Sequence, residues 1–586
     1  MKEMSDQMRG VVFVLAALAI LFAWQHFYKP PVPPPQPKGA PTAQTTGSAT
    51  SPKPPSAISS GAAQAGKKGA APVVARNPTV EQASEEKTVI VESGLYRVEF
   101  SNRGGVVKSW LLKKYFDDAK PPRPLDLVNA DAAQQLGWPF SLLLADAQQT
   151  EQANSALYKV TVDQGELGAE RDGAARGGNE FTAPATVTFH WSDGHLDIAK
   201  KLRFGTNYEV SVNAQATLDG KQLPVAIAWR GGFGDKAVYK ASIQVNVFYK
   251  QNDKLDLLQG KKLGVSGNQS QPSLQAGPLQ YAGIEDQFFT AAFLADGTNL
   301  SLWHWTQDHG IVEDGKPATE PIAEMAAGTL SGEPLEMRVF VGPKDLAILN
   351  AAKPPLEDLV QFGWTGIVAK PLLLVLQWLH KYIPNYGWAI VALTLLINVA
   401  MFPLKMKSWR SMQKMQKVGP EIRSIQDRYK KYSMTDPRKR KMNEEVMAIY
   451  QREGINPMGS CLPMVFQMPI WWALWRVLNG AIELRHAPWV GWIHDLSAMD
   501  PYYILPIAMT ITMYLMTKMT PQTTTDPAQQ KMLALMPLMM GFIFFRLSSG
   551  LNLYMFTSNL VGVAQQVYLN RTVPLPAKGK LKKKNE

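Results

Sequence analysis

The sequence has little of the chemistry on which most enzymes depend. Its single cysteine, Cys461, excludes a disulfide within the chain, so any exported domain must rely on its hydrophobic core. The eight histidines avoid the most apolar C-terminal stretches. Neither a GxxxxGK[ST] loop nor an HExxH pair occurs, which leaves nucleotide hydrolysis and zinc proteolysis without a visible site. The sequence therefore argues against an enzyme and predicts neither a metal nor a cofactor.

Acidic residues are missing from five apolar stretches in the C-terminal part of the chain. Proton-coupled transporters commonly carry such residues at membrane depth. A secondary transporter would also need paired, interrupted inverted repeats, and no matching half-repeats are visible. The transporter alternative therefore lacks its usual residues. The five stretches are 386–404, 461–480, 502–519, 532–547 and 551–569.

Positive charge is concentrated in two segments of this chain of net charge +12. Residues 405–457 contain 14 Lys or Arg against 6 Asp or Glu, and residues 571–586 contain 6 against 1. Nucleic acid is one interpretation of such an excess, but basic segments beside apolar stretches first indicate the cytoplasmic side of a membrane. We expect both segments in the cytoplasm, facing anionic lipids or a ribosome, with no specific nucleic-acid target.

The first 79 residues predict a membrane anchor and a tether. Residues 1–10 contain Lys2 and Arg9 and precede the apolar run 11–28, which is long enough to span a bilayer. No small-x-small cleavage pattern follows, so 11–28 is interpreted as an uncleaved signal anchor with residues 1–10 in the cytoplasm. Residues 29–79 are rich in Pro and Ala and cannot bury a core, which predicts a periplasmic tether.

Residues 80–352 alternate apolar and polar positions, as in "ATVTFHWSDGHLDIAKKLRF". This period of two predicts an antiparallel β-sandwich on the periplasmic side. The segment "HWSDGH" could be interpreted as a metal site, but it lacks the spacing of recurrent zinc motifs. A hairpin turn with solvated polar residues is the favoured interpretation.

The remaining residues predict a membrane domain. Residues 354–385 are amphipathic, contain Trp364 and Trp378 and are interrupted by Pro371, which is typical of a helix at the membrane interface. Together with 11–28, the five apolar stretches predict a polytopic α-helical membrane protein of six spans. Their connections are a basic cytoplasmic helical hairpin at 405–457, a periplasmic loop at 481–500, a cytoplasmic loop at 520–531 and a basic cytoplasmic tail at 570–586.

Amides, hydroxyls and methionines stand out within these spans. Thr394 and Asn398 are four residues apart and share a helix face, and 20 of the 25 methionines follow residue 400. The amides could make interhelical hydrogen bonds of about 0.6 kcal/mol each, or they could line a wet cavity. Methionines usually fill cores, but along a groove they would accept varied apolar partners. The other polar positions are Gln467, Asn552 and Asn559.

Several longer motifs indicate a family. The runs "NPMGSCLPMVFQMPIWWALW", "TDPAQQKMLALMP" and "SSGLNLYMFTSNLVGVAQQ" closely resemble the YidC membrane protein insertases of Gram-negative bacteria, and the resemblance covers roughly residues 355–570. The segment "SNRGGVVKSWLL" resembles that family's periplasmic β-supersandwich. The resemblance implies an inner-membrane insertase and chaperone with a five-helix core. Such proteins receive nascent membrane proteins from the ribosome, alone or with the Sec translocon, and release them laterally into the bilayer.

The resemblance also implies a hydrophilic groove that contacts substrate. Positions used for substrate contact correspond to Thr394, Trp471, Met509, Ile543 and Met555. The polar residues above would line the groove.

The family's groove arginine corresponds to Asn398, so a neutral amide replaces a cation. Arg546, about 60° from Ile543 on an ideal helix, is the preferred compensating charge. Arg476, five residues past Trp471, should face away and could pair with Glu483. A membrane-anchored periplasmic protein that binds or processes carbohydrate is the other alternative, although no convincing pair of carboxylates is visible.

Overall fold

The protein divides into two compact units in a computed structural model. A sheet unit extends to Val360 and a helical unit begins at Gln361. The structure describes residues 80–119, 121–164, 179–235, 245–260, 263, 272–313, 316–432, 436–455, 462–520 and 527–572. The predicted cytoplasmic N-terminus, signal anchor and tether (1–10, 11–28 and 29–79) and residues 573–586 of the predicted tail lie outside the described residues.

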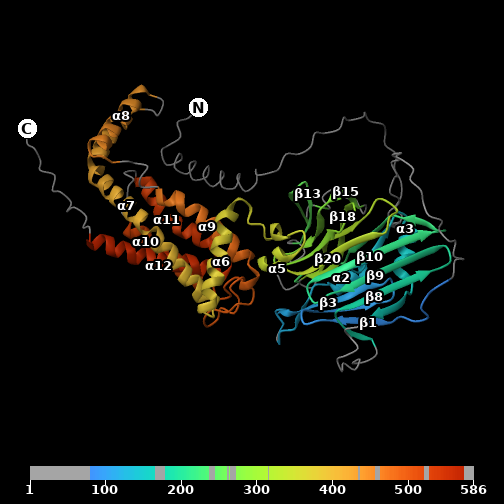
Figure 1. Ribbon diagram of the computed structural model, residues 1–586. Helices are drawn as coiled ribbons and strands as arrows, with labels where there is room; N and C mark the ends of the chain where they lie inside the picture. Colours follow the sequence, from blue (N-terminus) through green and yellow to red (C-terminus); the bar gives the residue numbers. More distant parts are fainter. Residues whose placement is uncertain are drawn as a thin grey trace, which may run out of the picture. The chain divides into compact units, whose positions relative to one another are not determined.

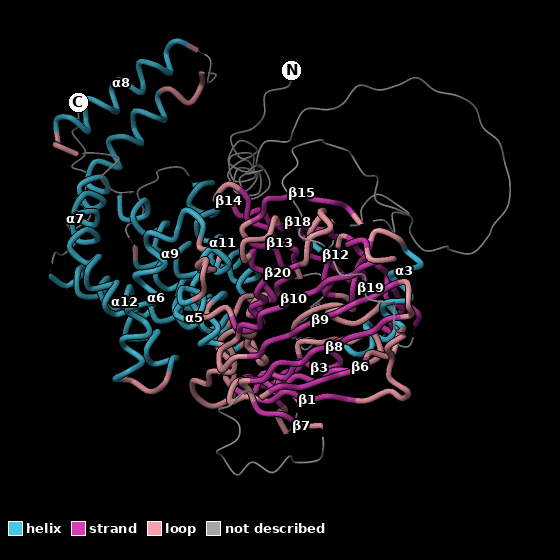
Figure 2. Tube along the Cα trace, turned by 45° about the vertical axis from the view of Figure 1, so that its right-hand side comes forward, coloured by secondary structure: helices cyan, strands magenta, loops and turns pink. Residues whose placement is uncertain are grey.

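The described residues of the sheet unit form three sheets, whose strands are magenta in Figure 2. Almost all pairings are antiparallel, and the short pairing of β1 with β7 is parallel. The first sheet has the order β4-β3-β2-β1-β7, with bounds Pro124–Asp126, Val106–Phe116, Tyr96–Ser101, Thr88–Glu92 and Glu180–Thr182.

The second sheet is the largest of the three. Its order is β14-β13-β16-β17-β20-β10-β9-β8-β6, and β11 pairs with β10. In that order the bounds are Lys254–Gln259, Asn246–Gln251, Tyr281–Glu285, Phe289–Ala295, Leu335–Pro343, Glu209–Leu218, Leu196–Phe204, Ala185–Ser192 and Lys159–Asp163, with β11 at Lys221–Leu223.

The third sheet has the order β15-β18-β19-β12-β5. Its strands run from Ser273–Leu279, Leu300–Glu313, Lys316–Gly328, Val225–Trp229 and Ser141–Leu144. Among the described residues, the unit also contains four short helices: α2 Ala130–Leu136, α3 Ala147–Ser155, α5 Leu346–Ala351 and η3 Glu357–Val360.

The alternation that predicted strands is visible in the burial of β8 and β9. These strands pair in register from Ala185↔Phe204 to Ser192↔Asp197, and inward and outward positions alternate along both. The segment "HWSDGH" is the hairpin turn, in which Asp193 Oδ1 accepts from the backbone N–H groups of His195 and Leu196 at 2.8 and 2.7 Å. Among the described residues, no group of three His, Cys, Asp or Glu is placed to hold a metal.

An aromatic cluster joins the three sheets. Trp110 of β3 stacks on Phe140, with ring centroids 5.8 Å apart, and also contacts Phe204 of β9 and Trp229 of β12 at 6.3 and 6.4 Å. All four side chains are at most 1% exposed. Aromatic contacts of this kind add about 0.5–1.5 kcal/mol each to the burial of large apolar surfaces. We therefore place the centre of the sheet unit at Trp110.

A lysine occupies one inward position of β9. Lys200 Nζ donates to the main-chain carbonyls of Gly104, Gly105 and Phe140 at 2.7, 2.6 and 3.1 Å. Gly104 and Gly105 have φ of 71° and 55°, a left-handed conformation that favours glycine and turns their carbonyls toward the amine. Burial lowers the pKa of Lys200 to about 7.

This buried amine should make the stability of the sheet unit depend on pH. The pKa of about 7 in the folded state is below the ordinary value of about 10.4, so between these values the unfolded chain binds more protons. We therefore expect the free energy of unfolding to rise with pH over this window, by up to about 1.4 kcal/mol per unit. Urea titrations of the full chain in detergent, followed by tryptophan fluorescence, would measure it. Lys200→Met should remove the slope, and an equal slope in both proteins would contradict this assignment.

The helical unit contains one long helix and several shorter ones, labelled in Figure 1. The long helix, α7, is continuous from Tyr386 to Arg428, so the predicted span 386–404 and the first arm of the predicted cytoplasmic hairpin form one helix. The others are η4 Gly363–Thr365, α6 Gly366–Tyr382, α8 Pro437–Arg452, α9 Leu462–Gly480, η6 Ile482–Leu484, α10 Ile504–Met519, α11 Pro527–Phe544 and α12 Ser549–Thr572.

Helices α7 and α8 form a hairpin, with α8 lying along the C-terminal half of α7 (Figure 1). Asp436 caps α8 by accepting from the backbone N–H of Arg438, and Pro437 occupies the first helical position. A small apolar core holds the hairpin together, and its outer faces are basic. The buried members of this core are Met415, Val418, Ile422, Ile425, Ile449 and Ile455.

Within the helical unit, α12 packs against α7, α9 and α10, and α10 packs against α11. Helices α10 and α11 approach each other closely at Gly541. A Cβ at this position would lie 2.4 Å from the hydroxyl oxygen of Thr510. Among the described residues, α7 has the length and apolar composition needed to cross a bilayer, while Ile504–Met519 and Lys531–Phe544 are apolar but shorter. The prediction of a sheet-rich domain followed by a helical core is confirmed at this level.

Candidate functional site

Two predicted polar residues lie buried on α7. Thr394 is fully buried, and its hydroxyl donates to the Ile390 carbonyl at 2.6 Å. Asn398 is 3% exposed, and its Nδ2 donates to the Thr394 carbonyl at 2.9 Å and to Ser558 Oγ of α12 at 3.2 Å. The Asn398 amide therefore links α7 to α12 by a hydrogen bond between the two helices.

A cation that sequence reasoning missed lies beside this amide. Lys405 Nζ is 2.7 Å from Asn398 Oδ1 and 3.4 Å from Gln565 Oε1 of α12. Gln565 Nε2 in turn donates to the main-chain carbonyl of Asn398 at 3.3 Å. We name these three residues and Ser558 the Asn398 cluster. Its sequence signal is the spacing of seven in "NVAMFPLK", which places both α7 residues on one helix face, but the predicted span ended at 404.

The other predicted amides connect further helices. Gln467 Nε2 of α9 donates to the Tyr554 hydroxyl of α12 at 3.1 Å. Asn559 Nδ2 of α12 donates to the Met509 carbonyl of α10 at 3.3 Å. Asn552 is fully buried, and its Nδ2 donates to carbonyls near the turn between α11 and α12 at 3.1 and 3.2 Å. Polar side chains thus join α12 to each helix that packs on it.

The predicted substrate-contact residues differ in their exposure. Met509 is fully buried, like Thr394, whereas Trp471 and Met555 are half-buried and Ile543 is 50% exposed. The Trp471 indole nitrogen is buried, and no partner for it is seen among the described residues. Ile543 is therefore the most exposed residue of this set, and Trp471 and Met555 are partly accessible.

Neither arginine proposed as a compensating charge contacts the Asn398 cluster among the described residues. Helix α11 ends at Phe544, so Arg546 lies in the turn before α12 and the helical angle from Ile543 does not apply to it. Arg476 is exposed, and its guanidinium lies over the Trp475 ring at 5.4 Å. The carboxylate of Glu483 accepts from Gln377 Nε2 at 2.6 Å.

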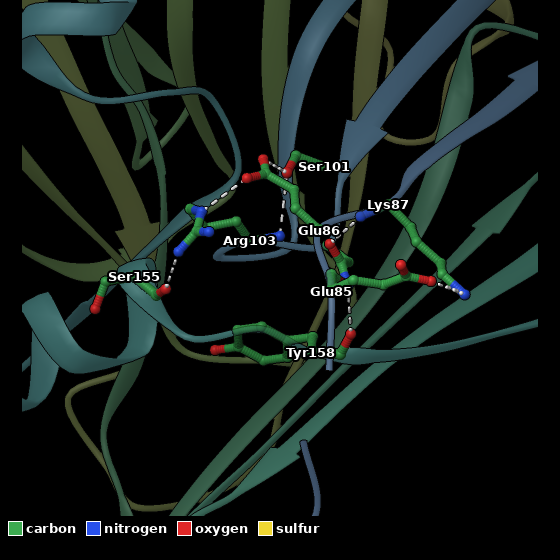
Figure 3. Close-up of polar contacts among 8 residues, drawn as sticks. Glu85, Glu86, Lys87, Ser101, Arg103, Ser155 and Tyr158 are labelled. Atoms are coloured by element: carbon green, nitrogen blue, oxygen red, sulfur yellow. Dashed lines mark hydrogen bonds and ion pairs between the residues drawn. The ribbon is translucent and has the colours of Figure 1, made fainter. Parts of the chain in front are cut away.

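The sheet unit contains a cleft of about 580 Å³ between its N-terminal segment and β6. Figure 3 shows polar groups near this edge, where Glu86 accepts from Ser101 at 2.7 Å and from Arg103 at 2.9 Å. Asn102, which lines the cleft, donates through Nδ2 to the Glu85 carbonyl. The Ser101 hydrogen bond, followed by that of Arg103, lowers the pKa of Glu86.

A second carboxylate, at the cleft itself, is paired in the same way. A hydrogen bond from Lys159 is the main cause that lowers the pKa of Glu81. Carboxylates held ionised by partners are unsuited to the general-acid role in glycoside hydrolysis. The cleft therefore gives the carbohydrate-processing alternative no support.

Two family models match the two units. The YidC periplasmic domain matches residues 88–375, and the 60Kd inner membrane protein matches residues 378–577. A membrane protein insertase YidC of Geobacter sp. (strain M21) is 33% identical over 495 residues, which cover 83% of this chain and 86% of the relative. The chain belongs to the YidC family of membrane protein insertases. The resemblance found in the sequence is thereby confirmed.

Two further YidC relatives match this chain over different lengths. The insertase of Geotalea uraniireducens (strain Rf4) is 30% identical over 577 residues, covering 97% of this chain and 99% of the relative. That of Wolinella succinogenes is 46% identical over 239 residues, covering 41% of this chain and 44% of the relative. The family models also assign an inner-membrane part and a periplasmic part.

Solved structures are similar at lower identity. The crystal structure of an active YidC insertase with its first transmembrane domain resolved is 19% identical and covers 83% of this chain and 94% of that chain, with a TM-score of 0.34. A galactose mutarotase-like protein from Lactobacillus casei is 13% identical and covers 44% of this chain and 100% of that chain, with a TM-score of 0.28. The family assignment rests on the sequence relatives.

Proposed function

We propose that this YidC family member inserts segments of nascent membrane proteins into the inner membrane and that their polar tails pass along the Asn398 cluster. The observation that carries the proposal is this cluster: an amide, a hydroxyl and an ammonium on α7 and α12, inside a helical unit whose predicted spans lack acidic residues. Polar side chains at membrane depth commonly mark a path for polar cargo. The protein would act as an insertase and chaperone, without catalysis.

Insertion along this path needs no chemical fuel. Polar groups in the inner part of the bundle would hold water and thin the apolar barrier, which is about 30 Å thick in an unmodified bilayer. Each Leu, Ile, Phe or Val of the client gains about 0.3–0.6 kcal/mol on entering the bilayer centre. The membrane potential adds about 2.3 kcal/mol per charge per 100 mV, which favours outward transfer of negative tails.

The proposed topology has six spans, with both termini in the cytoplasm and the sheet unit in the periplasm. Its support is the charge distribution: the basic segments 405–457 and 571–586 fall on the same side when the spans alternate. The amphipathic segment 354–385 includes α6, whose exposed face carries Trp378 and Tyr382, as expected at a membrane interface.

The α7–α8 hairpin supplies the surface for further partners. Its basic exterior suits polyanions, and we propose that it receives a ribosome with its nascent chain or contacts anionic lipids. Release of the client would be lateral, with the Sec translocon or without it. These partners are inferred from charge and family, and the cluster itself carries the insertion proposal.

Photo-crosslinking from the helical unit to a stalled nascent chain would test the proposed function. A crosslinker placed at Trp471 or Met555, the half-buried contact positions, should capture the client's apolar segment. A crosslinker at Val399, which is 68% exposed on α7, serves as the matched lipid-facing control and should give little client product. Equal yields at all three positions would mean that clients do not enter between these helices.

A further inference from the structure

An exposed arginine lies near the C-terminal end of α9. Arg476 is four residues before the last residue of this helix, Gly480, and its guanidinium lies 5.4 Å from the centroid of the Trp475 ring. Within the part of the chain that the structure describes, no carboxylate lies within ion-pair distance of it. Glu483, the partner considered for it in the sequence, accepts from Gln377 Nε2 at 2.6 Å. The guanidinium is therefore open to an anion from outside the chain.

Three tryptophans precede this arginine on the same helix. The ring centroid of Trp472 lies 5.1 Å from that of Trp471 and 5.7 Å from that of Trp475. Tryptophan is enriched where a membrane helix crosses the headgroup region, because its ring is amphipathic. A cation over an exposed indole gains about 0.5–1 kcal/mol, and a guanidinium has further N–H donors for a second partner. We name Arg476 and Trp475 the Arg476 site, and its composition is that of a headgroup contact.

The helix α6 indicates the depth of the Arg476 site. Helix α6 packs against α9 within the helical unit, and its Gln377 donates to Glu483, which follows the end of α9. The exposed side chains of Trp378 and Tyr382 on α6 are those expected at a membrane surface. The end of α9 that carries Arg476 therefore lies at the level of that surface, where the phosphates of the phospholipids are found.

A phosphate has the geometry that an arginine recognises. The planar guanidinium can bond two phosphate oxygens at once, and such charge-assisted bonds are roughly twice as strong as neutral ones. Val465, which is 61% exposed, precedes Arg476 by eleven residues and lies about 20° from it around an ideal helix. The two are about 16 Å apart along the helix axis, which is one leaflet's share of an apolar core about 30 Å thick. A phospholipid therefore fits this face of α9 with its phosphate at Arg476 and its acyl chains along the helix, and a free phosphate ion would lack the second contact.

We propose that the Arg476 site binds the phosphate of a phospholipid in the outer leaflet, whose acyl chains run along α9 toward Val465. This inference goes beyond insertion itself and rests on the proposed topology, in which α9 spans the membrane and ends at its outer surface. The bound lipid holds α9 at a constant depth. Because the same helix carries the contact position Trp471, the lipid also keeps that position at a constant depth while clients pass.

The test uses the full chain in vesicles of phosphatidylglycerol and phosphatidylcholine that contain a trace of phosphatidylglycerol with a photoactivatable headgroup. Mass spectrometry should find headgroup adducts on the part of α9 around Arg476. Arg476→Met should lower their yield at least about fivefold, because it removes a charge-assisted contact. Adducts on the basic α7–α8 hairpin, measured in the same sample, should not change. The matched control is Lys518→Met, which removes a cation 5.4 Å from the Tyr514 ring in the last turn of α10 and should leave the α9 adducts unchanged.

Unchanged α9 adducts with Arg476→Met would overturn the inference. So would α9 adducts that excess inorganic phosphate abolishes while the hairpin adducts persist, because the site would then belong to a free ion. A second lipid, with its photoactivatable group on the acyl chain, separates these failures from a failure of the topology. If this probe labels α9 and the headgroup probe does not, the span stands and the lipid site fails. If neither probe labels α9 in the wild type, the proposed topology itself fails.

Discussion

Replacing Asn398 by leucine is expected to reduce insertion of clients with charged tails at least about tenfold, while clients without such tails insert at the parental rate. The amide is buried and bonds to the Thr394 carbonyl, the Ser558 hydroxyl and the Lys405 ammonium. Leucine removes all three bonds and leaves Lys405 with Gln565 at 3.4 Å. A hydrogen bond to a charged group is worth about 1.5–3 kcal/mol, so its loss accounts for the expected ratio. Insertion of paired clients into proteoliposomes would measure it.

Thr512→Val is the matched control for this variant. The buried Thr512 hydroxyl donates to the Ala508 and Met509 carbonyls of its own helix, so its removal should leave both clients within about twofold of the parental rate. Asn398→Arg would introduce the family's groove arginine, but insertion should be impaired because the new cation would face Lys405. Combining it with Lys405→Met should restore insertion. Equal insertion of both client classes by Asn398→Leu would be incompatible with a polar path at this cluster.

Replacing Trp110 by alanine is expected to lower the free energy of unfolding of the sheet unit by about 3–5 kcal/mol. The indole is fully buried and contacts aromatic rings on the second and third sheets. Alanine would leave a cavity where three sheets meet. Thermal or urea unfolding of the full chain in detergent would measure the loss.

The same variant separates the roles of the two units. If the site lies in the helical unit, client insertion should remain within about twofold under conditions where the damaged sheet unit is partly unfolded. Phe116→Ala, at the exposed end of the same strand, controls for loss of an aromatic ring and should change stability by less than about 1 kcal/mol. Insertion that declines in step with sheet-unit stability would place part of the function in the periplasmic unit.

The sequence predicted the character of both units because each follows a simple periodicity. Alternation along segments such as 185–204 identified strands, and the turn chemistry of Asp193 identified a hairpin. The distribution of strands over three sheets could not be predicted, since distant segments such as β3, β9 and β12 meet through aromatic contacts that no local pattern encodes.

The candidate site was predicted in part, and the missing part has a physical explanation. Asn398 was recognised because an amide is conspicuous in an apolar run. Its cation was sought on distant arginines because Lys405 was counted with the basic hairpin. The predicted position of Arg546 relative to Ile543 assumed a helix with 100° per residue. That assumption does not hold, since α11 ends two residues before Arg546. A helix that continues past the apolar stretch brings a residue of the basic segment back to the amide.

The unbroken course of α7 has a mechanical consequence. Its 43 residues form a rod about 65 Å long, one end of which lies beyond the apolar stretch in the hairpin core. Prolines at 403 and 420 each remove one hydrogen bond of the helix and make it more compliant at those two points. A force applied to the hairpin would therefore bend α7 at these two prolines. The first of them, Pro403, lies between Asn398 and Lys405.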